Sequence, residues 1–446
     1  MNHEPVARVE FTREMKKDYT ILVPNMLPIH FEMICEILRQ EGYKIELLTT
    51  SHSAIVEEGL KYVHNDTCYP ALLVIGQMID ALKSGRYDVD HTALLISQTG
   101  GGCRASNYLS LLRKALQNAG FPQVPAISIN FKSELESNSG FKLSLLALVK
   151  ASFAMMYGDM LMWIANQCRP YEVQKGQTQA LVEKWTRKLT AQFRSPRCLM
   201  VRRNYKRILH DFGQIALQKR ERVPVGIVGE IYMKYASLGN NALEDFLVSQ
   251  GAEPVLSGLM DFCLYCTANA ANDHRLYGNA GFVRRASSAI ARFYLVKRQD
   301  QMIRAIQKDG RFLAPSRFDD VEKLADGMIG RGAKMGEGWL LTAEMMELIH
   351  SGVKNIVCTQ PFGCLPNHIV AKGMIRKIKE RYPEANIVAV DYDPGASRIN
   401  QENRLKLMLA NARESYIAPA AQMGLDLPPD ANLESGQERR ASGDVS

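Results

Sequence analysis

The chain has 446 residues, of which 46% are hydrophobic and 23% are charged. This composition excludes a largely disordered or fibrous protein, and the length exceeds a typical domain of about 100–200 residues, so we expect two packed domains. The formal net charge of +8 is small for this length. It is compatible with an anionic ligand or an acidic partner, and it gives little reason to expect nucleic-acid binding.

Short apolar runs alternate with helical spacing in the first part of the chain. Strands are predicted at residues 19–23, 44–49, 93–97 and 126–130, and helices at residues 30–41, 70–82 and 105–119. Strands that alternate with helices indicate a mostly parallel sheet that is covered on both faces.

The middle of the chain, residues 142–219, has an almost continuous helical pattern that breaks near residues 169–174 and 194–197. The most apolar stretch, residues 143–163, contains Lys150 and Asp159, so we expect a long helix of a soluble fold rather than a membrane span. The alternation then returns, with strands predicted at residues 223–228, 254–256, 356–359 and 387–390, and helices at residues 242–249, 280–308, 367–381 and 397–410.

These elements predict an α/β fold with two Rossmann-like parallel-sheet domains joined by a helical connector. The divisions are an N-terminal extension (1–18), a first α/β domain (19–141), the connector (142–222), a second α/β domain (223–414) and a disordered tail (415–446), where periodicity is lost and Pro, Gly, Ser and acidic residues are frequent.

The nine cysteines carry the main chemical signal. The first 17 residues are polar and charged and lack the apolar segment of a signal peptide. We therefore expect a cytoplasmic protein, in which cysteines are more often buried, metal-binding or catalytic than paired in disulfides.

Three cysteines lie in predicted loops that lead into helices. Cys103 follows three glycines after the strand at residues 93–97, Cys364 follows the strand at residues 356–359, and Cys68 precedes a helix that opens on proline. Ligands of open parallel sheets bind beyond the carboxyl ends of the strands. We therefore interpret these three cysteines as candidate metal ligands rather than as small core residues.

The other cysteines divide between packing and ligation. Cys35, Cys168 and Cys198 are interpreted as core residues, whereas Cys358, at the end of a strand, fits either role. Cys263 and Cys266 form a single C-x-x-C, which without a second pair does not predict a zinc ribbon. Widely spaced cysteines on facing loops suit an iron–sulfur cluster better, because its irons prefer thiolate ligands.

Several familiar motifs are missing from the sequence. It has no G-x-x-x-x-G-K-[ST] segment and no complete G-x-G-x-x-G after a strand, which argues against a P-loop ATPase and a dinucleotide site. Glu230 and Tyr232 follow a predicted strand and either line a ligand crevice or form a structural turn. Asp391 and Asp393 end the last predicted strand and either orient a ligand or cap a helix.

Five segments resemble a known family. They are QTGGGCRASNY (98–108), VGIVGEIYMKYASLGNN (225–241), EGWLLTAEM (337–345), QPFGCLPNHIVAKGMI (360–375) and VDYDPGASRINQENRLKLML (390–409). The family is the conserved domain fused to the ATPase of large 2-hydroxyacyl-CoA dehydratase activase-like proteins, which is related to dehydratase subunits and double-cubane-cluster proteins. The likeness covers most of residues 19–410, and because the ATPase is missing, the chain resembles a stand-alone version.

The resemblance implies an iron–sulfur cluster, [4Fe-4S] or double-cubane, held by cysteines between α/β domains. It also implies low-potential electron transfer from a separate ATP-hydrolysing activator protein. Cys68, Cys103, Cys364 and Cys266 fall in segments similar to the family's cysteine motifs, whereas Cys263 departs from the pattern. Cys358 is retained as a further candidate ligand. The substrate does not carry over from the resemblance.

Three functions are compatible with these expectations. The first is an iron–sulfur protein that takes electrons from an activator for a reductive or radical reaction. The second is a subunit of a 2-hydroxyacyl-CoA dehydratase, a lyase with an acyl-CoA substrate. The third is a non-catalytic scaffold of an activase ATPase, with purely structural cysteines. A homodimer or a heterodimer is compatible with each of them.

Overall fold

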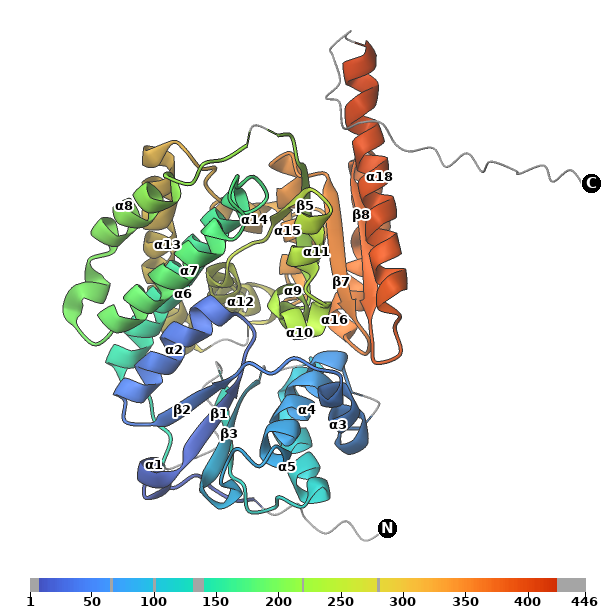
Figure 1. Cartoon of the computed structure of the whole chain (residues 1–446). Helices are drawn as coiled ribbons and strands as arrows, with labels where there is room; N and C mark the ends of the chain where they lie inside the picture. The colour runs from blue at the N-terminus through green and yellow to red at the C-terminus, as the bar shows by residue number, and fades with distance from the viewer. Residues whose placement is uncertain are drawn as a thin grey trace, which may run out of the picture.

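The computed structural model of the chain describes residues 8–64, 67–98, 102–130, 140–218, 220–278 and 281–422. These residues form two four-stranded sheets of parallel strands, surrounded by helices (Figure 1). The predicted α/β class with two Rossmann-like sheets is confirmed.

The first sheet has the strand order β2-β1-β3-β4 and is covered on both faces. Along β1, Ile21 and Val23 pack with residues of α2, whereas Leu22 lies in the core formed with α4 and α5. Successive strand residues point to opposite faces, so a sheet covered twice is apolar throughout. The bounds are α1 Met15–Asp18, β1 Thr20–Pro24, α2 Pro28–Gln40, β2 Lys44–Leu48, α3 Ala54–Tyr62, α4 Tyr69–Lys83, η1 Val89–His91, β3 Thr92–Gln98, η2 Arg104–Asn107, α5 Tyr108–Ala119 and β4 Ala126–Asn130.

The connector consists of α6 Leu145–Cys168, α7 Gln177–Gln192, η3 Pro196–Leu199 and α8 Val201–Phe212. Its two breaks lie where the sequence predicts them. Within the described residues, α6 is the one helix that by length and composition alone could cross a membrane, and 61% of its apolar window is buried inside the protein. Its side chains share a core with those of α7 and α8, and this packing accounts for the apolar composition.

The second sheet has the order β6-β5-β7-β8, which repeats the topology of the first sheet. Its strands are β5 Val223–Gly229, β6 Ala252–Val255, β7 Asn355–Pro361 and β8 Asn386–Tyr392. The helices are α9 Ile231–Tyr235, α10 Ser237–Asn240, α11 Leu243–Ser249, α12 Leu259–Tyr277, α13 Phe282–Asp309, α14 Phe318–Leu324, α15 Trp339–His350, α16 Leu365–Val370, η4 Lys372–Met374, α17 Ile375–Arg381 and α18 Arg398–Gln422.

Several elements differ from the sequence prediction. Helices α3, α12, α14 and α15 and the short helices α1, α9 and α10 were not predicted, and the helix predicted at residues 367–381 is broken into α16, η4 and α17. Helix α18 continues to Gln422, past residue 415, where the sequence predicts the start of a tail. The rest of that tail, residues 423–446, lies outside the described residues.

A buried hydrogen-bonded pair connects the first half, the connector and the second half. His30 of α2 shares a hydrogen bond with Asp159 of α6, with Nε2 and Oδ1 2.8 Å apart. The same carboxylate accepts the amide hydrogen bonds of Leu259 and Met260, at 2.8 and 2.9 Å, at the start of α12. These contacts fix how the halves face each other, with α10 and α16 above α3 and α4 in Figure 1.

Candidate functional site

The two halves meet directly at two of the predicted cysteines. The amide of Tyr69, at the start of α4, donates a hydrogen bond to the carbonyl of Phe362 after β7, with a distance of 3.0 Å. Cys68 precedes Tyr69 as the N-cap residue of α4, and Cys364 is the N-cap residue of α16. Both cysteines are 5% exposed, so their thiols lie at a buried junction.

Gly363 makes this close approach possible. Its φ of +72° lies in the left-handed region, which glycine adopts without strain. A Cβ at this position would lie 2.6 Å from the carbonyl oxygen of Thr67 and 3.1 Å from the Cα of Cys68. The backbone before Cys364 therefore rests against Cys68, and a side chain at residue 363 would separate them.

Cys103 reaches the same junction from the loop after β3. It is the N-cap residue of η2, and its Sγ accepts a hydrogen bond from the amide of Ala105 at 3.4 Å. A Cβ placed on Gly336 would lie 3.7 Å from this sulfur and 3.3 Å from Cγ of Pro366 in α16. The segment before α15 therefore lies between Cys103 and α16. Of the three glycines that precede Cys103, Gly100 and Gly101 lie outside the described residues.

Tyr108 connects Cys103 and Cys68. It begins α5, five positions after Cys103, and its Oη lies 3.0 Å from the Sγ of Cys68 in a shared hydrogen bond. Burial, together with the nearby Cys68 and Glu230, raises the pKa of Tyr108 well above its usual value. The phenol therefore stays protonated and can donate its hydrogen to the sulfur.

Two carboxyl groups belong to the same junction. Glu337 accepts the amide hydrogen bond of Ile231 at 2.9 Å, and Glu230 accepts that of Met233 at 2.9 Å as the N-cap residue of α9. Burial and the neighbouring Glu337 raise the pKa of Glu230 to about 8, and burial also raises the pKa of Glu337. The sequence named Glu230 as a crevice candidate, whereas it did not single out Glu337 or Tyr108.

The cysteine thiols are held in a medium that disfavours negative charge. Burial raises the pKa of Cys68 to about 11, against the opposing hydrogen bond from Tyr108. Burial, Glu230 and Glu337 together raise the pKa of Cys364 far above its usual value. Three thiols and two carboxyls are therefore concentrated at a junction where a bound cation would favour their ionised forms.

The structure does not bring Cys358 to this junction. Its side chain is fully buried in β7 within the core that α15 and α17 cover, and its Sγ lies 4.0 Å from Oδ1 of Asn367. The predicted core residues Cys35, Cys168 and Cys198 are buried, as expected.

Cys266 lies at the edge of the junction. It is exposed on α12, next to the buried Tyr265. Burial raises the pKa of Tyr265, and Cys266 and Cys103 are both among the nearby groups that raise it further. Cys266 itself is exposed, whereas Cys68 and Cys364 are buried.

The thiols of Cys68, Cys103 and Cys364 are of the ligand type that iron–sulfur clusters take, in which each thiolate binds a different iron. Among the described residues, no three His, Cys, Asp or Glu side chains lie close enough to bind one metal ion. The Oη atom of Tyr232 is buried and has no hydrogen-bond partner among the described residues. Tyr232 is the residue that the sequence analysis named together with Glu230 as a candidate for lining a crevice.

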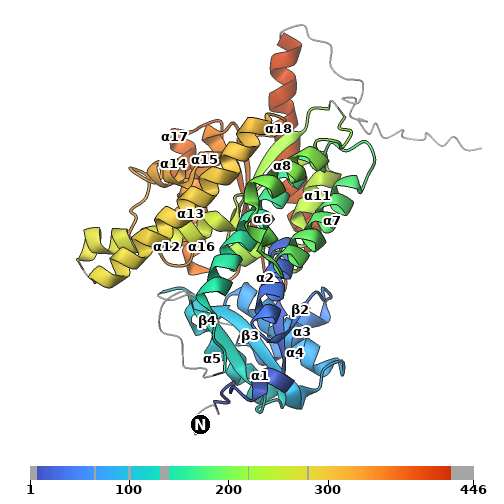
Figure 2. The same ribbon diagram turned by 90° about the vertical axis from the view of Figure 1, so that its left-hand side faces the viewer.

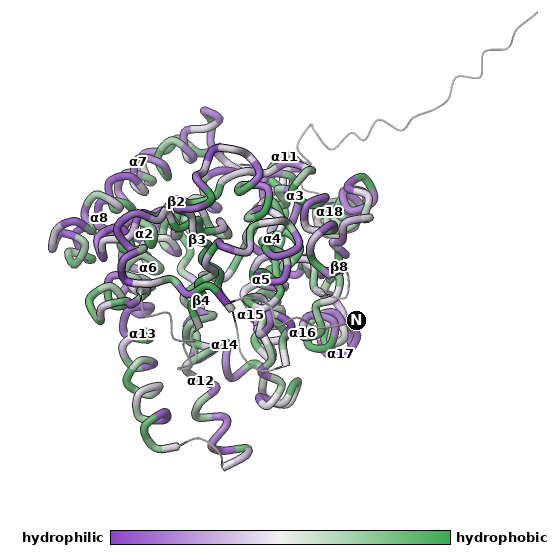
Figure 3. The backbone as a smooth tube through the Cα atoms, turned by 90° about the horizontal axis from the view of Figure 1, so that it is seen from below, coloured by the Kyte–Doolittle hydropathy of each residue, from purple (hydrophilic) through white to green (hydrophobic). Residues whose placement is uncertain are grey.

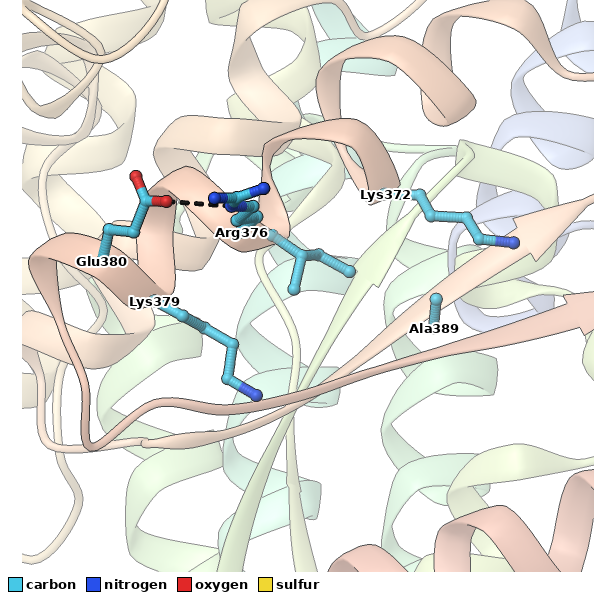
Figure 4. Close-up of a pocket in the computed structure, with 6 residues that line it drawn as sticks. Lys372, Arg376, Lys379, Glu380 and Ala389 are labelled. Carbon is cyan, nitrogen blue, oxygen red and sulfur yellow. Dashed lines mark hydrogen bonds and ion pairs between the residues drawn. The ribbon is translucent and has the colours of Figure 1, made fainter.

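A basic depression lies near the junction, at the outer edge of the second sheet. It has a volume of about 600 Å³, with Ile375 and Ala389 as apolar lining and Lys372, Arg376 and Lys379 as basic groups (Figure 4). Lys372 pairs with Asp391 at 2.8 Å, and Arg376 pairs with Glu380 at 3.0 Å. The sequence analysis did not single out this group, because its basic residues come from a segment that was predicted as one regular helix.

Comparison of the chain with family models, curated proteins and solved structures gives no match. The functional assignment therefore depends on the junction of Cys68, Cys103 and Cys364 and on the resemblance of the segments that surround it.

Proposed function

We propose that this chain is an iron–sulfur protein that receives low-potential electrons from a separate ATP-hydrolysing activator and uses them in a reductive or radical reaction. The observation that carries the proposal is the approach of Cys68, Cys103 and Cys364 from three loops of two α/β halves. A cluster bound there would supply one-electron transfer, which none of the twenty amino-acid side chains provides readily at low potential.

Each residue of the junction has a physical role in this proposal. Cys68, Cys103 and Cys364 would bind iron as thiolates. Cys68 is at the start of the 15-residue helix α4, where backbone amides and the helix dipole favour negative charge. Tyr108 would donate a hydrogen bond to the sulfur of Cys68, and hydrogen bonds to cluster sulfurs raise the reduction potential.

Glu230 and Glu337 would set the charge around the cysteines. In their protonated forms they add no negative charge, which makes reduction easier, and after ionisation they oppose it. Gly363 leaves room for the close approach of the loops, because a Cβ added there would lie 2.6 Å from the carbonyl oxygen of Thr67 and 3.1 Å from the Cα of Cys68.

Anaerobic reconstitution tests the proposal. The full chain is purified without oxygen, incubated with ferrous iron, sulfide and a thiol reductant, desalted, and assayed for iron, acid-labile sulfide and visible absorption. We expect a brown protein with stoichiometric iron and sulfide, and bleaching of its absorption on reduction. A colourless protein without iron after this treatment would overturn the proposal.

The basic depression favours a second candidate function, that of a 2-hydroxyacyl-CoA dehydratase subunit. Lys372 follows α16, which is six residues or about 9 Å long and starts after Cys364. The nucleotide end of a CoA thioester carries phosphates, which Lys372, Arg376 and Lys379 would bind, and the pantetheine arm would then have to extend toward the cysteines.

Calorimetric titration distinguishes this second function. The protein is titrated with acetyl-CoA and with acetyl-pantetheine, which lacks the phosphates. The dehydratase hypothesis predicts binding of acetyl-CoA alone, and a loss of at least tenfold in affinity in Lys372→Ala and Lys379→Ala. Lys323→Ala, an exposed lysine of α14, is the control. Equal affinity in all variants, or no binding, would contradict the dehydratase function and leave electron transfer as the proposed function.

We also propose a cytoplasmic location. All nine cysteines lie within the described residues and none of them forms a disulfide there, as expected for a reducing compartment.

A further inference from the structure

A helical hairpin formed by α12 and α13 projects from the body of the molecule (Figures 2 and 3). The first three turns of α13 expose four large apolar side chains, with exposed fractions of 79% for Phe282, 79% for Val283, 71% for Ile290 and 62% for Phe293. At about 200 Å² per aromatic side chain, the two phenylalanines alone expose on the order of 300 Å². The largest apolar patch on a soluble monomer is typically about 300–600 Å² and often has a function.

The charged residues of the same segment point away from this apolar face. Arg284 pairs with Asp273 at 3.3 Å, and Arg285 contacts His274 of α12 at 2.9 Å. Arg292 binds Asp319 and Glu322, both at 2.6 Å. Phe282, Val283, Ala286, Ile290 and Phe293 lie within about 100° of the helix circumference at 3.6 residues per turn. This face is apolar up to Phe293, where Nζ of Lys297 lies over the ring at 4.1 Å from its centre.

The sequence of this segment is partly the same in both directions. The twelve residues FVRRASSAIARF run from Phe282 to Phe293, and three of the six symmetric position pairs are identical: Phe282 with Phe293, Ala286 with Ala289, and Ser287 with Ser288. Two helices that pack antiparallel about a two-fold axis pair their residues in this reversed order. The small alanines would allow the helices to approach at the centre, and the phenylalanines would pack at both ends.

We propose that a second copy of this chain covers the exposed face of α13, so that two α13 helices pack antiparallel across a two-fold axis. Phe282 then packs against Phe293 of the partner subunit, and Ala286 lies opposite Ala289 of the partner subunit. The symmetric placement of Phe282 with Phe293 and of Ala286 with Ala289 favours a copy of the same chain over an unrelated partner, because an isologous interface requires each face to be complementary to itself.

The hairpin also contacts the segment that lies next to Cys103. Lys334 forms an ion pair with Asp273 of α12, and a Cβ on Gly332 would lie 2.4 Å from Oη of Tyr277 at the end of α12. Met335 of the same segment packs against Gly102, where a Cβ would lie 2.2 Å from its Sδ. Dimerisation through α13 would therefore hold the base of the hairpin and the segment beside the cysteine junction in place.

Sedimentation equilibrium of the purified full chain tests this proposal, from about 1 to 50 µM. We expect a dimer for the natural chain, and for Ile399→Glu, in which a residue on α18 that is 69% exposed is changed in the same way. Phe282→Glu and Ile290→Glu are expected to be monomers over this range, a loss of at least tenfold in dimer affinity. The unfolding midpoints of the two monomeric variants should not depend on protein concentration, whereas that of Ile399→Glu should rise with concentration and should match theirs only where it is dissociated.

A cross-linking experiment fixes the geometry of the pair. In the double variant Ala286→Cys and Ala289→Cys, mild oxidation should give a covalent dimer in which a peptide with residue 286 is joined to one with residue 289. A monomeric natural chain, a dimer that Phe282→Glu and Ile290→Glu leave intact, or vesicle binding by a monomer through this face would each overturn the proposal. Iron content is a separate measurement, and its loss would bear only on the cluster.

Discussion

The amide of Tyr69 donates a hydrogen bond of 3.0 Å to the carbonyl of Phe362, and this bond joins the two α/β halves beside Cys68 and Cys364. It forms between residues that are almost 300 positions apart in the sequence. The contact places the beginning of α4 against the loop after β7. The cysteine junction therefore depends on how the halves pack, and changes to this contact should affect the stability and the metal content together.

Replacement of Gly363 by alanine should destabilise the protein. The left-handed φ costs a non-glycine residue about 1–2 kcal/mol, and the added Cβ would meet Thr67 and Cys68 at 2.6 and 3.1 Å. Gly352→Ala is the control, since its φ is +90° and nothing lies within 4 Å of its Cβ position. Urea unfolding should give a clearly larger loss for Gly363→Ala. Equal losses would contradict the contact between the loops.

The hydrogen bond between Tyr108 and Cys68 should contribute to stability. Tyr108→Phe removes the hydroxyl and keeps the ring, so we expect a loss of about 0.5–1.5 kcal/mol in the free energy of unfolding. The hydrogen bond opposes the rise in the pKa of Cys68, so its loss should also slow alkylation of this thiol, followed by mass spectrometry at pH 8. Faster alkylation of Cys68 in a variant of unchanged stability would speak against this role.

The buried carboxyls predict how stability depends on pH in the metal-free protein. The pKa of Glu230 is raised to about 8 in the folded chain, above its unfolded value, so folding takes up a proton between these two values. The stabilisation of the folded chain by the proton on Glu230 is fully present at low pH and is lost as the pH rises toward 8. Each proton linked in this way contributes at most about 1.4 kcal/mol per pH unit.

Urea midpoints at pH 5, 6, 7 and 8 check this slope. Glu230→Gln should be less sensitive to pH than the natural chain and more stable than it at pH 8. Glu380→Gln, on the surface in α17, is the matched control and should keep the natural slope. A natural chain whose stability rises with pH over this interval would be inconsistent with a buried, protonated Glu230.

The apolar strand runs were sufficient to predict the fold, because each of the eight strands is buried on at least one face and reads as a short hydrophobic segment. Helix α3 was missed although its apolar residues have helical spacing, because it is only nine residues long and contains Gly59, a poor helix former. A Cβ on Gly76 of α4 would lie 2.2 Å from the carbonyl of Ile55 in α3, so the two helices cross at glycines.

The candidate site was predictable only in part. The positions of Cys68, Cys103 and Cys364 before helices are local features, and the sequence displays them. Glu337 joins the site through the amide of Ile231, which is 106 positions away, and no local pattern encodes such a contact. Cys358 and Cys364 are six residues apart, yet the first points into the core of the sheet and the second lies at the junction.

Iron and sulfide analysis of cysteine variants after anaerobic reconstitution is the most direct test of the iron–sulfur proposal. Cys68→Ser, Cys103→Ser and Cys364→Ser should each lose most of the bound iron and the visible absorption. Cys198→Ser, a buried cysteine of the connector, should retain them at the natural level. Full iron and sulfide content in all three junction variants, or no iron in the natural chain, would contradict the proposal.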